Sequence, residues 1–320
     1  MSMTSATPTH CMPDSVDATG WAPATTAGDR LDEGLVRQAA LGARNLPIDV
    51  DEAIIRFASE PHHSGALLIR NATIGELPPT PATPESPTHK DLATELALLT
   101  VARRLGEPVG YVPEHGGRIV QNIVPTRTDA DRQTSTSSRS NLMFHTETAF
   151  HPFRPRYLLL LCLRGDPAAR TTLVSVHELI DRLPNNIVDI MFQPRFRTAV
   201  DASFLDGRTN ELGPARPLIT GTSHEPTFVF DAELTVGTDS AADEALVQVR
   251  DLIEQIATSV VLEPGDLLVI DNNIAVHGRS PFAARFDGND RWLQRSFVVS
   301  DLAPSAGQRV GRVITTEFGR

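Results

Sequence analysis

The first third of the chain carries apolar residues at the three- and four-residue spacing of amphipathic helices. The longest of these runs ends near Gly106 and has Thr88 as a candidate N-cap. The segments with this periodicity are 29–45, 49–60 and 89–107. Residues 1–28 are rich in Thr, Ala, Pro and Ser and lack periodicity, which predicts a disordered or loosely docked tail.

From about residue 110 onward the pattern changes to short apolar runs bounded by Gly, Pro, Asp or Asn, as is typical of strands. Helical patterns at about 177–192 and 240–258 interrupt these runs. The strand-like runs are GRIVQNIVP, RYLLLLCLR, TTLVSV, RFRTAV, RPLITG, TFVFD, GDLLVID, NIAVHG and WLQRSFVVSD. Helices followed by many short strands predict an α+β fold with an antiparallel sandwich or barrel core.

Charge and composition narrow the class of protein. The 320 residues include 40 acids and 29 bases, and this net charge of −11 argues against nucleic acid or an anionic membrane as the main partner. It leaves open a small-molecule partner, including an anionic one, because a pocket can hold its own arginines. The sequence has no apolar run long enough to predict a membrane span. Its two cysteines, Cys11 and Cys162, lie far apart, which suits a reducing compartment, so we expect a cytoplasmic protein. Homo-oligomerisation is left open.

The stretch NLMFHTETAFHPFRP contains the first candidate for chemistry. If the chain is extended there, His145 and Glu147 point to the same face. An ordinary polar pair on a strand is the alternative. The polar segment 126–140 precedes them and is either a surface loop or a mobile lid over a site. A second such pair, His89 and Asp91, opens a predicted helix, where an acid is favoured for structural reasons.

An iron site of the type with two histidines and one carboxylate needs a further imidazole from elsewhere in the fold. His277 is the best candidate, because it follows an apolar strand, a tight Asp-Asn-Asn turn and a second short strand in LLVIDNNIAVHGRSPF. Arg291 and Arg295 come next and would share one face of a strand. Two buried guanidiniums require anions, whereas an exposed strand face with two solvated arginines is the alternative.

At these residues the sequence resembles a known family. The segments FHTETAFHPFRPRYLLLLCLRGDP, TTLVSV and LLVIDNNIAVHGRSPFAARFDGNDRWLQRSF resemble the clavaminate synthase-like Fe(II)/2-oxoglutarate-dependent oxygenases, nearest to the branch that hydroxylates free amino acids. The resemblance covers roughly residues 110–300. It implies a distorted double-stranded β-helix, or jelly-roll, with helices packed outside. We therefore expect one oxygenase domain over 29–320, with a helical part at 29–107 and a jelly-roll core at about 110–300.

The resemblance also implies the cofactor site. It implies Fe(II) as the metal, with His145, Glu147 and His277 as its ligands and catalytic centre. It implies 2-oxoglutarate and O2 as co-substrates. Arg291 matches the arginine that binds the distal carboxylate of 2-oxoglutarate, and Thr172 matches the hydroxyl that assists it.

The same resemblance implies a substrate site. Arg295 matches the arginine that receives the carboxylate of the amino acid, and Ser135 lies where a family serine touches that carboxylate. Either Glu114 or His115 lies where an arginine-hydroxylating relative has a glutamine near the substrate amino group, so the residue type differs here.

Two acids in TFVFDAEL complete the expected substrate site. Asp231 and Glu233 match the segment where hydroxylases of basic amino acids hold the cationic end of the substrate, and on an extended segment both would face the same way. A solvated turn is the alternative. The likeness of GPARPLITGTSHEPTFVFDAE and of the Arg295 segment to lysine hydroxylases favours lysine over arginine.

The hypothesis from the sequence is a dioxygenase that hydroxylates an unactivated methylene of a free basic L-amino acid, with lysine as the first choice. Arginine or another amino acid, desaturation in place of hydroxylation, and an amino acid carried on a protein are alternatives within the class. A non-catalytic jelly-roll that binds a cationic ligand and a zinc hydrolase with the same three ligands are alternatives from other classes. The zinc hydrolase gives no reason for Arg291 at its spacing.

Overall fold

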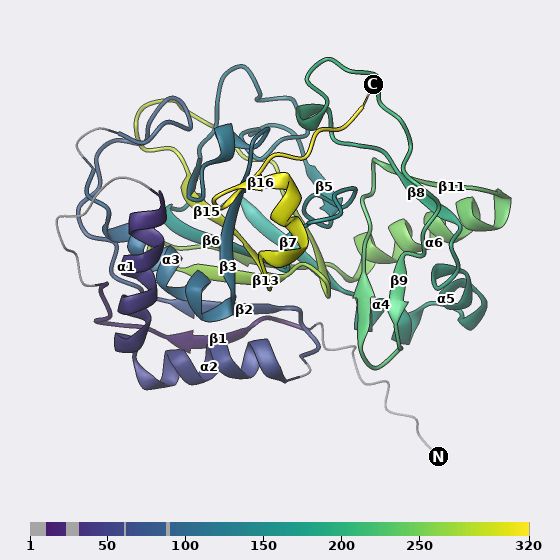
Figure 1. Ribbon diagram of the computed structural model, residues 1–320, viewed down its shortest axis with the longest axis horizontal. Coiled ribbons are helices and arrows are strands. Elements are labelled where there is room, and N and C mark those ends of the chain that lie inside the picture. Colours follow the sequence, from purple (N-terminus) through teal and green to yellow (C-terminus); the bar gives the residue numbers. More distant parts are fainter. Residues whose placement is uncertain (1–10, 24–31, 61, 88–89, 320) are drawn as a thin grey trace.

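The computed structural model describes residues 11–23, 32–60, 62–87 and 90–319, which form helices, a large sheet, a smaller sheet and two short ribbons (Figure 1). The α-helices are α1 (Asp32–Gly42), α2 (Ile48–Ser59), α3 (Ala93–Leu105), α4 (Val176–Arg182), α5 (Asn185–Met191) and α6 (Ser240–Ile256). The 3-10 turns are η1 (Ala43–Asn45), η2 (His115–Gly117), η3 (Ala202–Phe204) and η4 (Ala303–Gln308).

The helices agree with the periodicity of the sequence, with shorter bounds. The pattern at 177–192 forms two helices, α4 and α5, because Pro184 between them has no N–H for a continuous helix. Helix α3 begins at Ala93, whose N–H donates to the Asp91 carboxylate, and it ends before Gly106. The predicted cap Thr88 and His89 lie outside the described residues. No helix in the described ranges is long and apolar enough to cross a bilayer.

The large sheet runs across the middle of the molecule. In the described part of the chain its strands are, in order, β1 (Asp14–Asp17), β2 (Ala66–Arg70), β13 (Leu267–Asp271), β6 (Tyr157–Arg164), β15 (Trp292–Val299), β3 (Glu107–Tyr111), β17 (Val313–Ile314) and β16 (Arg309–Val310), with β4 (Gln121–Ile123) also paired to β15. The central pairs β13–β6 and β6–β15 are antiparallel.

The smaller sheet has the order β12 (Thr258–Val261), β7 (Arg170–Ser175), β14 (Ala275–Arg279) and β5 (Leu142–His145). Two ribbons accompany it: β9 (Ile219–Gly221) with β10 (Pro226–Phe228), and β8 (Phe196–Thr198) with β11 (Thr235–Gly237). Helices α4, α5 and α6 lie with these ribbons at one side of the molecule, and α1, α2 and α3 lie at the other (Figure 1). The antiparallel core predicted from the sequence is confirmed, as is the α+β class.

Alternation along the strands divides the apolar residues into layers. In β6, Leu159 and Leu161 pack toward α2 and α3, whereas Leu158 and Leu160 pack into the core between the two sheets. Cys162 follows Leu160 in that inter-sheet core; it is fully buried, and burial raises the pKa of its thiol to about 12. The outer face of the smaller sheet is covered by apolar residues of α4, α5 and α6. The site described below opens at one end of the inter-sheet core.

The N-terminal segment differs from the expectation of a tail. Residues 14–17 form β1, which pairs in parallel with β2 and extends the large sheet. Composition missed this strand because its residues, DSVD, carry one apolar side chain; the pairing uses backbone groups at the edge of β2. Trp21, which is buried against α2 and α3, anchors the segment beyond the strand.

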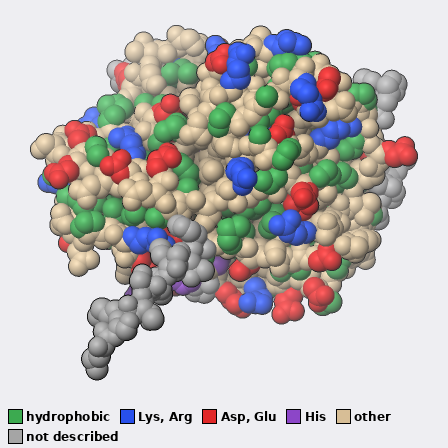
Figure 2. Space-filling model, turned by 180° about the vertical axis from the view of Figure 1, so that it is seen from behind, with side chains coloured by type: hydrophobic (Ala, Val, Ile, Leu, Met, Phe, Trp, Pro, Cys, Tyr) green, Lys and Arg blue, Asp and Glu red, His purple; other side chains and the backbone are tan. Residues whose placement is uncertain are grey.

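The surface carries mixed charge. On the face shown in Figure 2, acidic and basic side chains are interspersed among hydrophobic ones, and neither sign gathers over one region. This face therefore shows no patch of one charge sign that would indicate a nucleic-acid or anionic-membrane surface.

Candidate functional site

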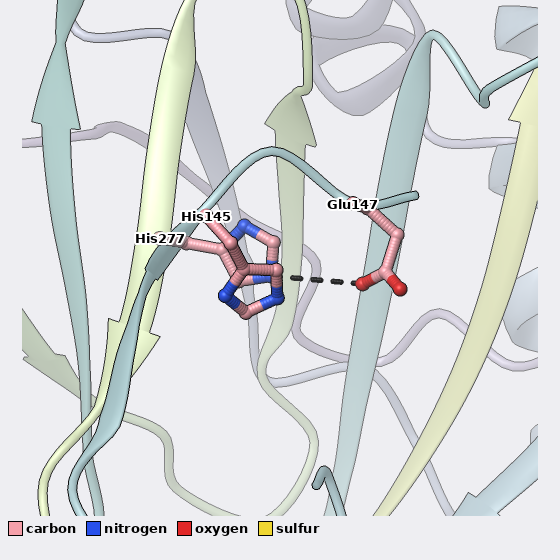
Figure 3. Close-up of side chains that lie close together, drawn as sticks. All are labelled: His145, Glu147 and His277. Atoms are coloured by element: carbon pink, nitrogen blue, oxygen red, sulfur yellow. Dashed lines mark ion pairs between the residues drawn. The ribbon is translucent and has the colours of Figure 1, made fainter. Parts of the chain in front are cut away.

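Three side chains from two strands and a loop converge at the end of the inter-sheet core. His145 ends β5 and pairs in register with His277 in β14, and Glu147 follows in the loop after β5. The imidazole centroids lie 4.4 Å apart, and His277 Nε2 lies 3.7 Å from Glu147 Oε2. Figure 3 shows the carboxylate and both rings turned toward one another. Their candidate ligand atoms all lie within 4.8 Å of one another, so the three could hold one metal ion.

The chemistry of these donors suits a divalent transition metal. His145 Nδ1 lies 2.8 Å from the Met143 carbonyl oxygen, so the proton belongs on Nδ1 and Nε2 is left to ligate. Burial lowers the pKa of His277 well below its usual value, which keeps that imidazole neutral. Burial raises the pKa of Glu147, an effect that a bound cation would reverse. Two imidazoles and one carboxylate form the donor set that non-haem Fe(II) favours.

A cavity of about 350 Å³ adjoins the three side chains. It lies between the two sheets, below segment 126–140 and beside η3. Nine of the residues singled out in the sequence line it: Glu114, His115, Ser135, His145, Glu147, Asp231, His277, Arg291 and Arg295. The structure therefore brings most of the expected site together from segments that are far apart in the sequence.

The threonine expected to assist Arg291 is shifted by one residue. Thr171, which is buried, lines the cavity, whereas Thr172 does not. Successive side chains of a strand point to opposite faces, and Leu173 shares the inner face with Thr171. Thr172 accordingly points to the outer face of β7, and the expectation for it is wrong by one register position.

The two acids of TFVFDAEL do not share a face. Asp231 lines the cavity, but Glu233 is exposed and Leu234 takes its place in the wall. The reason is local: Asp231 Oδ1 accepts hydrogen bonds from the N–H groups of Glu233 and Leu234, at 2.9 and 2.8 Å, and closes a turn. The segment is therefore not extended, which corrects the expectation of two paired acids.

A different acid lines the cavity with Asp231. Asp201 caps η3, where its Oδ1 accepts hydrogen bonds from the N–H and the hydroxyl of Ser203. Within the described residues neither Asp201 nor Asp231 has a basic ion-pair partner. Asp201 was missed because it lies between strand-like runs, in a segment whose pattern carries no signal for a site.

Both arginines of the β15 segment are buried, which excludes an exposed strand face. Arg291 is 7% exposed, and among the described residues its guanidinium has no hydrogen-bond or ion-pair partner and lies only over the Phe282 ring. Burial lowers its pKa to about 10, so it remains charged. Arg295 donates to Gln121 Oε1 and, at 2.6 Å, to Glu114 Oε2.

Segment 126–140 covers the cavity and has an internal framework. The Asp129 carboxylate accepts hydrogen bonds from the Thr126 and Thr136 hydroxyls, at 2.8 and 2.9 Å. Arg279, two residues after His277, donates to the backbone carbonyls of Ser137 and Ser140. The segment is thus tied to β14. Its position over the cavity agrees with a lid, and its mobility stays a prediction.

His151, the other histidine of the opening stretch, packs rather than ligates. It is 1% exposed among aromatic rings, and its Nδ1 accepts a hydrogen bond from Phe153 N–H at 2.9 Å. Burial lowers its pKa to about 3. An unfolded histidine has a pKa of about 6.5. As the pH falls below that value, the unfolded chain therefore binds a proton that the folded chain does not bind.

We expect His151 to make the protein acid-sensitive in that window. Its contribution to the free energy of unfolding is complete above about pH 6.5 and falls by about 1.4 kcal/mol per pH unit until about pH 3. Urea unfolding at several pH values measures this slope. His151→Phe should reduce the slope, whereas His224→Phe at an exposed position should not; an unchanged slope in His151→Phe would contradict the assignment.

The fold and the site define a class. Two imidazoles and a carboxylate meet at the mouth of an antiparallel core, beside a cavity with an unpaired buried arginine, as a non-haem metal oxygenase with an anionic co-substrate requires. Residues 208–297 match the taurine catabolism dioxygenase TauD, TfdA family.

Curated relatives extend over most of the chain. L-lysine 3-hydroxylase of Catenulispora acidiphila is 40% identical over 88% of this chain and 80% of its own. L-asparagine oxygenase of Streptomyces coelicolor is 35% identical over 92% of this chain and 89% of its own. Clavaminate synthase 2 of Streptomyces clavuligerus is 32% identical over 88% of this chain and 89% of its own.

Solved structures agree. Asparagine oxygenase with Fe(II), 2S,3S-3-hydroxyasparagine and succinate has a TM-score of 0.81 at 33% identity, covering 87% of this chain and 88% of that one. The non-heme iron oxygenase OrfP with Fe and alpha-ketoglutaric acid has a TM-score of 0.79 at 33% identity, covering 88% and 90%. The chain belongs to the clavaminate synthase-like Fe(II)/2-oxoglutarate-dependent oxygenases. It is therefore an enzyme that uses Fe(II), 2-oxoglutarate and O2.

Proposed function

We propose that this enzyme hydroxylates an unactivated methylene of a free basic L-amino acid, with L-lysine as the first choice. One observation carries the choice of a basic side chain: Asp201 and Asp231 line the cavity without a basic ion-pair partner among the described residues. Two carboxylates that face one small cavity favour a cationic ligand between them. The relative that is 40% identical is named for lysine, which agrees with this choice.

The other charged groups of the cavity have hydrogen-bond or ion-pair partners in the described structure. Glu114 pairs with Arg295, and Asp129 is bound by hydroxyls within segment 126–140. Arg279 is held by backbone carbonyls. Three features of the cavity still require a ligand. The three converging donors require a metal, Arg291 requires an anion, and Asp201 and Asp231 require a cation. A 2-oxoglutarate-dependent hydroxylase of a basic amino acid meets all three.

His145, Glu147 and His277 would hold Fe(II). The two sheets around them would form the double-stranded β-helix. Arg291 offers a guanidinium fork to the distal carboxylate of 2-oxoglutarate, and the Thr171 hydroxyl, on the same cavity wall, would add a hydrogen bond. When bound, Fe(II) with 2-oxoglutarate and O2 supplies the oxidising power to insert one oxygen atom into a C–H bond, with release of succinate and CO2.

The Arg295–Glu114 pair is complementary to the zwitterionic end of an amino acid. Arg295 would bind the α-carboxylate and Glu114 the α-ammonium group, with the Ser135 hydroxyl nearby. Burial and the charge of Arg295 lower the pKa of His115 to about 4, so this neighbour is neutral and does not repel the ammonium group. Held at Arg295 at one end and at Asp201 and Asp231 at the other, one methylene would be fixed beside the metal.

The decisive experiment is incubation with Fe(II), 2-oxoglutarate, ascorbate and each of the twenty amino acids singly, followed by mass spectrometry. We expect a product of lysine that is heavier by one oxygen atom, formed together with succinate. A product lighter by two hydrogens would indicate desaturation instead. If a neutral amino acid reacts while lysine and arginine stay unchanged, the role of Asp201 and Asp231 is wrong. If no amino acid supports succinate formation, free amino acids are not the substrates.

A further inference from the structure

The side chain of Asn272 holds both backbone groups of one of the candidate metal ligands. Asn272 lies in the turn between β13 and β14 and is 1% exposed. Its Oδ1 accepts a hydrogen bond from Glu147 N–H at 2.7 Å, and its Nδ2 donates to the Glu147 carbonyl at 3.1 Å. Nδ2 also donates to the Pro155 carbonyl at 2.9 Å. Asn272 lies 125 residues beyond Glu147 in the sequence and 117 beyond Pro155, so these are tertiary contacts.

Glu147 requires such support because it stands just beyond the end of β5. Thr146 N–H still donates to the Phe230 carbonyl, but Glu147 N–H is held only by Asn272 among the described residues. The next residue, Thr148, has a φ of 50°, in the left-handed region that β-branched residues rarely adopt. Such a conformation costs about 1–3 kcal/mol and persists only where the surroundings fix it.

The turn that carries Asn272 also starts the strand of His277. Asp271, the last residue of β13, is fully buried, accepts a hydrogen bond from Asn273 N–H at 3.0 Å and pairs with Arg156 at 3.1 Å. Asn272 N–H donates to the Arg156 carbonyl. The same turn thus leads into β14 and holds the backbone of Glu147. This one turn therefore sets the position of Glu147 relative to His277.

We propose that Asn272 is a positioning residue for the metal site, acting through the backbone of Glu147; this rests on the proposed role of Glu147 as a ligand. A primary amide is the side chain that can accept one hydrogen bond and donate two in this arrangement. Without it, the backbone at Thr148 is free to leave the left-handed region, and the Glu147 carboxylate loses its fixed distance to His277. Partners that orient metal ligands typically contribute 10- to 100-fold to metal affinity.

The test compares Asn272→Ala with Asn273→Ala, a matched control in the same turn whose side chain makes no hydrogen bond in the described structure. Anaerobic titration of Fe(II) in the presence of 2-oxoglutarate, followed by the visible charge-transfer band, gives the Kd for the metal. Hydrogen exchange with mass spectrometry follows the backbone amide of Glu147. Asn272→Ala should weaken Fe(II) binding by about 10- to 100-fold and speed exchange at Glu147. Asn273→Ala should change neither.

The outcomes separate positioning from general stability. A merely structural role would lower the melting temperature without metal and leave the Kd of the folded protein unchanged, which would overturn the proposal, as would unchanged exchange at Glu147. If Asn272→Ala does not fold, Asn272→Asp serves: it keeps an acceptor for Glu147 N–H, loses both donated bonds, and should still weaken Fe(II) binding. Absence of a charge-transfer band in the wild type, or its survival in His145→Ala, would count against the proposed function, while exchange at Glu147 would still test the contact.

Discussion

Arg291→Met is expected to raise the KM for 2-oxoglutarate by about 100-fold or more and to leave the fold intact. The guanidinium is buried without an ion-pair partner among the described residues, so its binding capacity is available to a carboxylate. A hydrogen bond to a charged group contributes about 1.5–3 kcal/mol, and two of them correspond to at least two factors of ten. Methionine fills similar space and removes a buried charge, so the protein should not lose stability.

The measurement is succinate formation at saturating amino acid over a range of 2-oxoglutarate concentrations. Arg197→Met removes an exposed arginine on β8, outside the cavity, and should leave the KM unchanged. A KM for 2-oxoglutarate that is the same in Arg291→Met and in the wild type would contradict the role of Arg291. A higher KM for the amino acid alone would assign this arginine to the substrate instead.

Asp231→Asn and Asp201→Asn are each expected to lower kcat/KM for lysine by about 10- to 100-fold. Each substitution keeps the size and the polar character of the side chain and removes one charge from the end of the cavity. The loss corresponds to about 1.5–3 kcal/mol for a hydrogen bond between charged groups in a partly buried site. Competition assays with lysine and a neutral amino acid of similar length measure the effect, because kcat/KM should fall only for the cationic substrate.

Glu233→Gln is the matched control for these two variants. Glu233 lies two residues after Asp231 and also carries a carboxylate, but it is exposed and outside the cavity wall. Its replacement should leave kcat/KM for lysine unchanged. If Glu233→Gln lowers kcat/KM as strongly as Asp231→Asn does, the turn at Asp231 opens in solution and both acids face the substrate. If neither Asp201→Asn nor Asp231→Asn has an effect, the substrate is not held by its cationic end.

Strand geometry predicted that His145 and Glu147 share a face, as do Arg291 and Arg295, whereas the family resemblance joined His277 to the first pair as a candidate metal site. Positions two apart share a face, so Arg291, Leu293 and Arg295 were expected together, and all three line the cavity. The same rule decides between Thr171 and Thr172, but only once the register of β7 against β14 is known. In the structure Thr172 stands opposite Gly278 and Leu173 opposite His277. A one-residue choice of this kind depends on pairing between distant strands, which the local sequence does not specify.

The substrate end of the cavity was less predictable for a different reason. Asp231 closes its own turn with two backbone N–H groups, so the two-residue spacing does not predict which way the Glu233 side chain points. Asp201 comes from a 3-10 turn between strands and reaches the cavity only through the packing of the whole chain. The contact of Asn272 with Glu147 likewise joins positions 125 residues apart. These features are tertiary, and no periodic pattern carries them.

The burial of Cys162 provides a direct way to observe opening of the core. Its thiol lies between the two sheets and, with a pKa near 12, stays protonated and out of reach of alkylating reagents in the closed protein. Cys11, the other cysteine, is partly accessible. Modification of a second thiol therefore requires the sheets to separate, and its rate reports how often that happens. Because the proposed metal donors lie at the mouth of the same core, Fe(II) should slow this labelling in proportion to its occupancy.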